Sequence, residues 1–167
     1  MQMVERVVVV AAAVLIGLSG CSGGGGGSTD TMDMTLPEGA ASPEQAVEVF
    51  LDAVTESQRA KAAGEFTEAD RAYERMASVF GTDRGSISKS FSAEEVRNRM
   101  IVLAACFRPI AYRIVTQPDP GAWQSKAATV TAELQRGQEV LTLPFRLVLS
   151  SEERWFIEQI DVSTLSC

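Results

Sequence analysis

From Ser42 onward the apolar residues of this chain change their spacing once, at Pro109, and that change constrains the fold more than any other feature. Before Pro109 they recur every three to four positions, as on one face of an α-helix. From Ile110 onward they alternate with polar residues, as in a β-strand with one face in a core. The sequence therefore predicts an α+β domain in which helices come first and a sheet follows.

Three helices are predicted before the proline. The first starts at Ser42–Gln45 (SPEQ), where a serine cap precedes a proline suited to the first turn, and it ends near Gly64. The second runs from Thr67 to a Gly81 cap, and the third opens with a second capping signature, Ser92–Glu95 (SAEE). Their apolar faces are Ala46, Val47, Phe50, Leu51 and Val54; Ala69, Ala72, Tyr73, Met76, Val79 and Phe80; and Val96, Met100, Leu103, Ala104 and Phe107.

Four strands are predicted after the proline, and their order along the chain favours an antiparallel meander. They are expected at residues 110–115, 125–135, 139–149 and 155–162. A turn rich in proline and glycine at 117–121 separates the first two, and Arg136-Gly137 connects the next two. Pro144 lacks an N–H for the ladder, so it marks a bulge or an unpaired edge position.

Two segments of this domain resemble the nuclear-transport-factor-2-like (cystatin-like) superfamily. They are the opening SPEQAVEVFL at residues 42–51 and the closing RWFIEQID at residues 154–161, in a chain of matching element order and length. The resemblance covers residues 42–163. It implies that the N-terminal helices pack on a curved, four-stranded antiparallel sheet, which gives residues 42–167 a cone-like form.

The N-terminal region has the composition of a secretory signal peptide. Val7–Leu18 is an apolar run of 12 residues, whereas a membrane-spanning helix needs about 20. Arg6 supplies a basic flank before the run. A buried helix is the alternative, but the five glycines that follow would separate such a helix from any core. We therefore expect residues 1–20 to be a signal peptide.

Leu18-Ser19-Gly20-Cys21 resembles the lipobox of bacterial lipoproteins. The resemblance implies cleavage after Gly20 and attachment of a diacylglycerol to the Cys21 thiol, and further acylation (palmitate, for example) would make the anchor stable. It also implies an extracytoplasmic, lipid-anchored location in the bacterial cell envelope. Ser22 after the cysteine is similar to the enterobacterial signal for the outer membrane, if the host has one.

Residues 21–41 are expected to form a flexible tether between this anchor and the domain. Five glycines are followed by serine, threonine and acidic residues, which cannot bury enough apolar surface to offset the entropy of ordering. No residue from Ser22 to Ala41 belongs to an apolar periodic pattern. We therefore expect the tether to be dispensable for folding.

Composition excludes several classes of function. A net charge of −7 is unsuited to nucleic acid, which calls for a basic surface. The chain has no histidine, which excludes Ser-His-Asp and Cys-His nucleophiles and histidine-based zinc sites. No carboxylate loop typical of a metal site is present either. We therefore expect no metal and no cofactor.

Once Cys21 carries lipid, two cysteines are left, Cys106 and Cys167. In an oxidising compartment these two can form a disulfide. The alternative is a buried free thiol at Cys106, within the apolar run IVLAACF, and an exposed thiol at Cys167. Both alternatives remain open on the sequence alone, because spacing does not report side-chain geometry.

The candidate pocket residues are few. The resemblance implies acid–base residues and hydroxyl donors inside a cone. The candidates for such a pocket are Tyr73, Tyr112, Trp155 and Asp161. Asp52 and Asp70 are also of a suitable type, but they lie beside the apolar faces of their helices and are expected to be solvated. Trp123 and Trp155 suggest ligand stacking, although core roles explain them better. Five arginines suggest an anion-binding patch or simply solvated faces: Arg97, Arg99, Arg108, Arg113 and Arg154.

Two functions remain on the sequence alone. The leading one is a non-enzymatic lipoprotein that binds a small apolar ligand or another envelope protein. The alternative is an acid–base enzyme of the isomerase or dehydratase kind that uses a cone-shaped pocket. Two titratable groups buried in a cavity would favour the enzyme, whereas a filled cone would favour the binding protein.

Overall fold

The computed structural model describes residues 37–109, 111–115, 125–163 and 165. All of them belong to one compact unit, Met34–Cys167. The expected signal peptide, the lipobox and residues 21–36 of the expected tether lie outside the described residues. So do Ile110, the turn at 117–121, Trp123 and Cys167.

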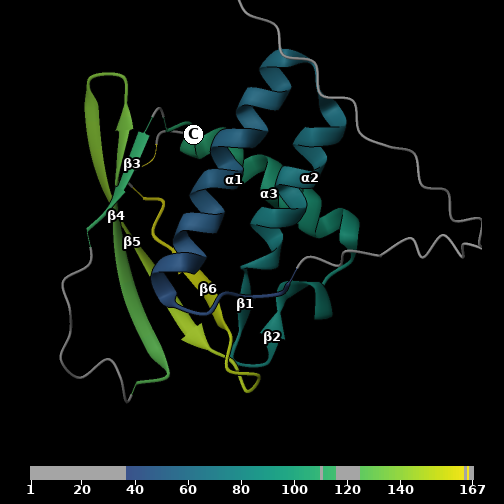
Figure 1. Ribbon diagram of the computed structural model, residues 1–167, viewed down its shortest axis with the longest axis vertical. Helices are drawn as coiled ribbons and strands as arrows, with labels where there is room; N and C mark the ends of the chain where they lie inside the picture. Colours follow the sequence, from purple (N-terminus) through teal and green to yellow (C-terminus); the bar gives the residue numbers. More distant parts are fainter. Residues whose placement is uncertain (1–36, 110, 116–124, 164, 166–167) are drawn as a thin grey trace, which may run out of the picture. The chain divides into compact units, whose positions relative to one another are not determined.

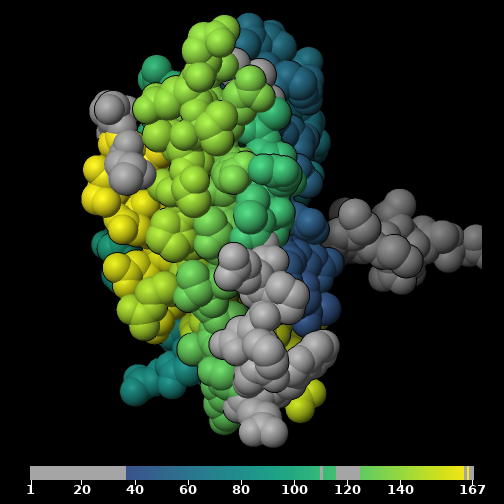
Figure 2. Space-filling view, turned by 90° about the vertical axis from the view of Figure 1, so that its left-hand side faces the viewer, coloured from purple at the N-terminus to yellow at the C-terminus, as the bar shows by residue number. Residues whose placement is uncertain are grey.

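Three helices precede a four-stranded antiparallel sheet, which confirms the predicted α+β class. The helices are α1 (Pro43–Ala63), α2 (Phe66–Ser78) and α3 (Ala93–Phe107). The sheet has the order β3-β4-β5-β6, formed by β3 (Ala111–Ile114), β4 (Ala127–Arg136), β5 (Glu139–Leu149) and β6 (Trp155–Ile160). Figure 1 shows α1, α2 and α3 on one side of this sheet, and Figure 2 shows the opposite side, formed largely by β4 and β5. The sheet is not strongly curled there, so the cone-like form is not confirmed.

Between α2 and α3 the chain forms a small hairpin where a loop was expected. The strands β1 (Gly81–Thr82) and β2 (Gly85–Ser86) pair antiparallel, and a single 3₁₀ turn, η1 (Ile87–Lys89), follows. Gly81 does not cap α2 as predicted, because that helix has already ended at Ser78.

Both predicted serine caps form, but the full capping box forms only at α3, because at α1 the Gln45 side chain bonds to the residue before the cap. The Ser42 Oγ accepts a hydrogen bond from the Gln45 N–H at 3.1 Å, and the Gln45 side chain accepts one from the Ala41 N–H at 2.9 Å. At α3, the Ser92 hydroxyl accepts from the Glu95 N–H at 3.3 Å, and the Glu95 carboxylate accepts from the Ser92 N–H at 3.0 Å. The bonds from Ser92, first from its backbone N–H and then from its hydroxyl, lower the pKa of Glu95.

The space between α1 and the sheet is filled by aromatic rings. Phe50, near the start of α1, meets three other rings edge-on, at centroid distances of 5.4 Å to Phe80, 5.0 Å to Phe107 and 6.0 Å to Phe145. Edge-to-face contacts of this kind add to the stabilisation that burial provides. The alternate residues of β4 and β5 that face these rings are buried: Val130, Ala132, Leu134, Leu143, Phe145 and Leu147.

The outer edge of β6 is covered by two short segments of chain, one of them from the expected tether. Ala40 pairs with Trp155, with N–H···O distances of 2.9 Å in both directions, and the Ile157 N–H donates to the Val79 carbonyl at 2.8 Å. Ala40 is buried, and Gly39 has a left-handed φ of +69°. The expectation that the tether extends through Ala41 was therefore wrong at its end, because Gly39 and Ala40 belong to the folded domain.

Pro144 lies at a position where its missing N–H is harmless. It pairs with Thr131 on the β4 side of β5. On its other side β6 has just ended, and the Asp161 N–H donates to the Pro144 carbonyl at 3.4 Å. The register shift between β5 and β6 occurs instead at Arg146/Leu147. Pro144 is therefore neither bulged nor on an edge strand, and it is tolerated in an inner strand because the neighbouring strand β6 ends beside it.

Candidate functional site

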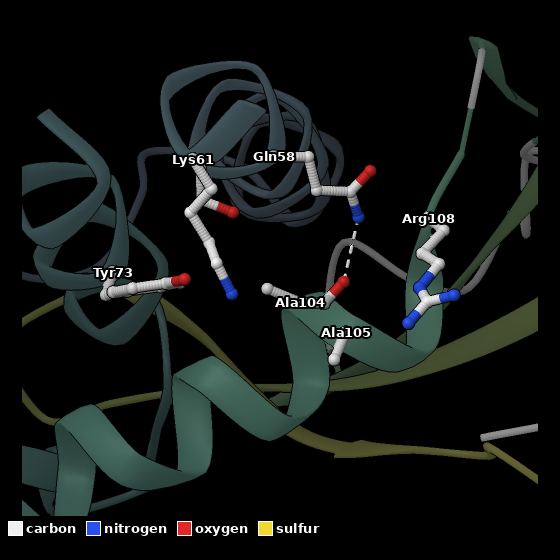
Figure 3. Close-up of a pocket in the computed structure, with 7 residues that line it drawn as sticks. Gln58, Lys61, Tyr73, Ala104, Ala105 and Arg108 are labelled. Carbon is white, nitrogen blue, oxygen red and sulfur yellow. Dashed lines mark hydrogen bonds between the residues drawn. The ribbon is translucent and has the colours of Figure 1, made fainter. Parts of the chain in front are cut away.

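A cavity of about 260 Å³ opens where the last turns of α1 and the end of α3 meet α2. Its lining comprises Ser57, Gln58, Lys61, Tyr73, Ala104, Ala105 and Arg108. Figure 3 shows the Tyr73 hydroxyl and the Lys61 amine directed toward the same space, with Arg108 at the end of α3 on the other side of Ala104 and Ala105. The cavity thus collects cationic, hydroxyl and amide groups from three helices, and its lining contains no carboxylate.

Tyr73 is the buried polar group of this cavity. The residue is 4% exposed, yet its hydroxyl has no hydrogen-bond partner among the described residues. A buried hydroxyl without a partner costs about 1–3 kcal/mol. Ser57, which is also buried, is satisfied, because its hydroxyl donates to the Val54 carbonyl at 2.8 Å. Tyr73 therefore presents a free donor to whatever occupies the cavity.

Lys61 and Arg108 bring positive charge to the cavity, and neither forms an ion pair in the described part of the chain. Both side chains come from helix ends. The carbonyls at a helix C-terminus favour nearby cations, which is one reason for their placement. One such carbonyl is already satisfied, because the Gln58 amide donates to the Ala104 carbonyl at 2.8 Å, as Figure 3 shows.

Arg108 has an unusual backbone for an arginine. It ends α3 with φ 36° and ψ 48°, in the left-handed region that favours glycine. Pro109 follows and has no N–H to return to the helix. A non-glycine residue in this conformation costs about 1–2 kcal/mol. The chain bears that cost at a residue whose side chain lines the cavity.

The four residues that the sequence proposed for a pocket are not brought together. Tyr73 lines the cavity, whereas Tyr112, Trp155 and Asp161 do not. Trp155 begins β6, pairs with Ala40 and packs against the hydrophobic core. Asp161 follows the end of β6. The pKa of Asp161 is lowered because its carboxylate accepts hydrogen bonds from Ser163.

Tyr112 makes a separate contact between β3 and α1. Its hydroxyl donates to the Asp52 carboxylate at 2.6 Å. Burial raises the pKa of Tyr112, and the hydrogen bond to Asp52 and the negative charges of Asp52 and Glu48 raise it further. The phenol therefore keeps its proton at neutral pH and ties the sheet edge to the helix.

The five arginines do not form the anion-binding patch that the sequence suggested. Arg97 pairs with Asp70 at 2.5 Å and Arg113 pairs with Glu133 at 2.6 Å. Arg99 lies over the Phe91 ring at 3.7 Å, and Arg154 donates to the Gly39 carbonyl at 2.7 Å. Arg108 is the one of the five that lines the cavity.

Sequence reasoning missed most of this lining. Ser57, Gln58 and Lys61 lie where the apolar pattern of α1 fades, and that fading was the available signal. From Thr55 to the end of α1 only Ser57 and Ala60 are buried, so most side chains of this segment lie outside the packed core. Ala104 was assigned to the core face of α3, which is consistent with its burial.

Cys106 lies at the end of α3 and is 7% exposed. It is disulfide-bonded, and its partner lies outside the described residues, so the pairing with Cys167 stays a prediction. Leu165, two residues before Cys167, is buried and belongs to the same hydrophobic cluster as Cys106. Leu165, on the segment after β6, therefore packs in the core.

Within the described ranges, no helix is long and apolar enough to cross a membrane. In the same part of the chain, no group of three or more histidine, cysteine, aspartate or glutamate residues is arranged to hold a metal ion. No family model, no curated protein and no solved structure matches the chain.

Proposed function

We propose that this chain is a lipid-anchored protein of the bacterial cell envelope whose folded domain binds a small ligand without transforming it. The anchor rests on Leu18–Cys21, which has the lipobox pattern after a short apolar run. It places the domain outside the cytoplasm, and on the outer membrane if the host has one. The domain part is supported by the order of helices and antiparallel strands, which resembles that of nuclear-transport-factor-2-like proteins.

The cavity in Figure 3 is the observation that carries the binding function. It offers a free buried hydroxyl and two cations without ion-pair partners, which are groups that recognise a ligand. General acid–base catalysis calls for a proton donor and acceptor placed together, and the lining contains no carboxylate or histidine. The space under the sheet that a cone-shaped enzyme would use is filled by the rings around Phe50.

The anchor is tested by replacing Cys21 with serine in a bacterial host. The wild-type chain should incorporate an alkyne analogue of palmitate and sediment with membranes, and Cys21→Ser should do neither. Cys167→Ser is the matched control, because it removes one cysteine and leaves Leu18–Cys21 intact. Labelling of Cys21→Ser at the wild-type level would reject the anchor.

The alternative is an acid–base enzyme, and the contact between Tyr112 and Asp52 is the observation closest to it. The discriminating measurement is mass spectrometry of a ligand captured by the purified protein. Recovery of the ligand unchanged after prolonged incubation supports binding alone. Conversion that is lost in both Asp52→Asn and Tyr112→Phe would favour the enzyme.

A further inference from the structure

We propose that the cavity between α1, α2 and α3 binds a phosphate group, held by Lys61 and Arg108 and by a hydrogen bond from the Tyr73 hydroxyl. The phosphate belongs either to a small phosphorylated molecule or to a phospholipid headgroup. This inference deepens the proposed binding function and rests on it.

The charge of the cavity is the first argument. The chain carries a net charge of −7, and six of the fourteen basic residues that the structure describes are neutralised by ion pairs. The paired basic residues are Arg59, Arg71, Arg75, Lys89, Arg97 and Arg113. Lys61 and Arg108 have no such partner and line the same cavity without a carboxylate between them. Both side chains are exposed at the mouth of the cavity, on either side of Ala104 and Ala105, so an anion that enters would meet positive charge from two sides.

The second argument is the buried hydroxyl of Tyr73. Buried polar groups almost always have a partner, from the protein or from ordered water, so this hydroxyl needs an acceptor that the described residues do not supply. Figure 3 shows this hydroxyl directed into the cavity, toward the same space as the Lys61 amine. An anionic oxygen at that point would accept the hydroxyl proton in a short, charge-assisted hydrogen bond.

The third argument is the identity of residue 108. Glycine fits the left-handed end of a helix without strain, whereas an arginine there is strained. Residues strained in this way cluster at functional sites, and this one has a side chain that lines the cavity. Two cations and one hydroxyl donor match a phosphate group, whether a monoester with nearly two negative charges and three acceptor oxygens or a lipid phosphodiester with one charge and two such oxygens.

A competing account is that the two cations only offset the carbonyls at the ends of α1 and α3. It predicts no saturable anion binding and no response at Tyr73. A reporter inside the cavity therefore separates the two accounts. The chain offers one, because Tyr73 and Tyr112 are its two tyrosines.

The experiment uses a chain that starts at Ser22, with both tyrosines replaced by 3-fluorotyrosine and observed by ¹⁹F NMR. Tyr112→Phe identifies the Tyr73 resonance. Inorganic phosphate should shift that resonance in a saturable way and leave the Tyr112 resonance in place. Lys61→Met and Arg108→Gly should each weaken binding about tenfold or more, equivalent to about 1.4 kcal/mol. Arg84→Gln is the matched control, because Arg84 is exposed, has no ion pair and lies outside the cavity.

Acetate and chloride at matched ionic strength form the second arm, and vesicles form the third. A Tyr73 shift that saturates with acetate but not with phosphate would overturn the phosphate assignment and leave a binding function standing. A response to phosphatidylglycerol vesicles but not to phosphatidylcholine vesicles would identify the headgroup as the source. A response to free phosphate alone would identify a soluble molecule.

The proposal is overturned if the Tyr73 resonance does not respond to phosphate or to anionic vesicles. It is also overturned if Lys61→Met and Arg108→Gly both keep the wild-type affinity. Neither result affects palmitate labelling at Cys21, so failure of the phosphate site and failure of the anchor are distinguishable.

Discussion

The two ends of α1 contact very different surroundings. Near the start of the helix, Phe50 is fully buried and its ring meets three others edge-on. Two turns later, Ser57, Gln58 and Lys61 face a cavity. Close packing at the first end fixes how the helix lies on the sheet. The other end is packed less closely and leaves a cavity lined by polar groups.

The largest effect is expected from breaking the packed end. Phe50→Ala should lower the free energy of unfolding by about 3–5 kcal/mol, because it leaves a cavity among the rings that now surround Phe50. Phe66→Ala is the control, since Phe66 is 70% exposed and should change stability by less than about 0.5 kcal/mol. Urea denaturation measures both. Similar urea midpoints for Phe50→Ala and Phe66→Ala would show that the start of α1 is not closely packed, and would contradict the difference between the two ends of this helix.

The free energy of unfolding should also depend on the disulfide of Cys106, which lies at the end of α3 next to the cavity-lining Ala105. If Cys167 is the partner, the bridge closes a loop of about 60 residues and contributes about 4 kcal/mol. Intact mass after alkylation without reduction should show both thiols protected in the chain that starts at Ser22. Reduction should lower the unfolding midpoint of this chain and leave that of Cys167→Ser unchanged. Alkylation of both cysteines without reduction would reject the pairing.

Removal of the segment that covers β6 should have an intermediate effect. A chain that starts at Ala41 loses the pairing of Ala40 with Trp155 and the bonds from Arg154 to the Glu38 and Gly39 carbonyls. At about 0.5–1.5 kcal/mol net for each hydrogen bond, the expected loss is about 2 kcal/mol or more. A chain that starts at Pro37 should unfold at the same midpoint as one that starts at Ser22. Equal midpoints for the starts at Pro37 and Ala41 would show that this pairing contributes nothing.

A smaller effect, of opposite sign, is expected at the cavity. Arg108→Gly relieves the left-handed strain but makes the unfolded chain more flexible, so stability should stay the same or rise by up to about 1 kcal/mol. Arg99→Gly, in the interior of α3, should cost about 1 kcal/mol, and it also removes the contact with the Phe91 ring. Thermal unfolding compares the two variants. A clear loss of stability in Arg108→Gly would show that its side chain is needed for the fold.

The smallest effect concerns the contact between Tyr112 and Asp52, and it depends on pH. Because the pKa of Tyr112 is raised in the folded state, the unfolded chain loses this proton first as the pH rises above about 10. The stabilisation is therefore fully present below that pH and is lost above it. Tyr112→Phe should show a shallower decline of the unfolding midpoint between neutral and alkaline pH. If the unfolding midpoints of the wild type and Tyr112→Phe decline in parallel as the pH rises, the contact between Tyr112 and Asp52 does not contribute to the pH dependence of stability.

The sequence predicted the elements well where a local signal decides them. The SPEQ and SAEE signatures mark the starts of α1 and α3, because a serine cap involves only neighbouring residues. Alternation along β4 and β5 likewise identifies the buried face. The covering of β6 was missed, because Ala40 is held by Trp155, more than a hundred residues away.

The candidate site was predicted less well, for a similar reason. Tyr73 has the spacing of its core neighbours on α2, and nothing local shows that its hydroxyl lacks a partner. The left-handed backbone of Arg108 carries no signal either, since the residue usual at such positions is glycine. The cavity becomes visible only when three helices are placed together.

The covered edge of β6 also determines how the domain meets a mechanical load. Any tension carried by the chain before Pro37 enters the fold through residues 38–40, which are held by Arg154, Trp155 and the Ser78 carbonyl. These few hydrogen bonds break before the load can reach the rings around Phe50. When the domain is pulled from its N-terminal side, residues 38–40 should detach first. The tether would then be longer by these residues while the core stays folded.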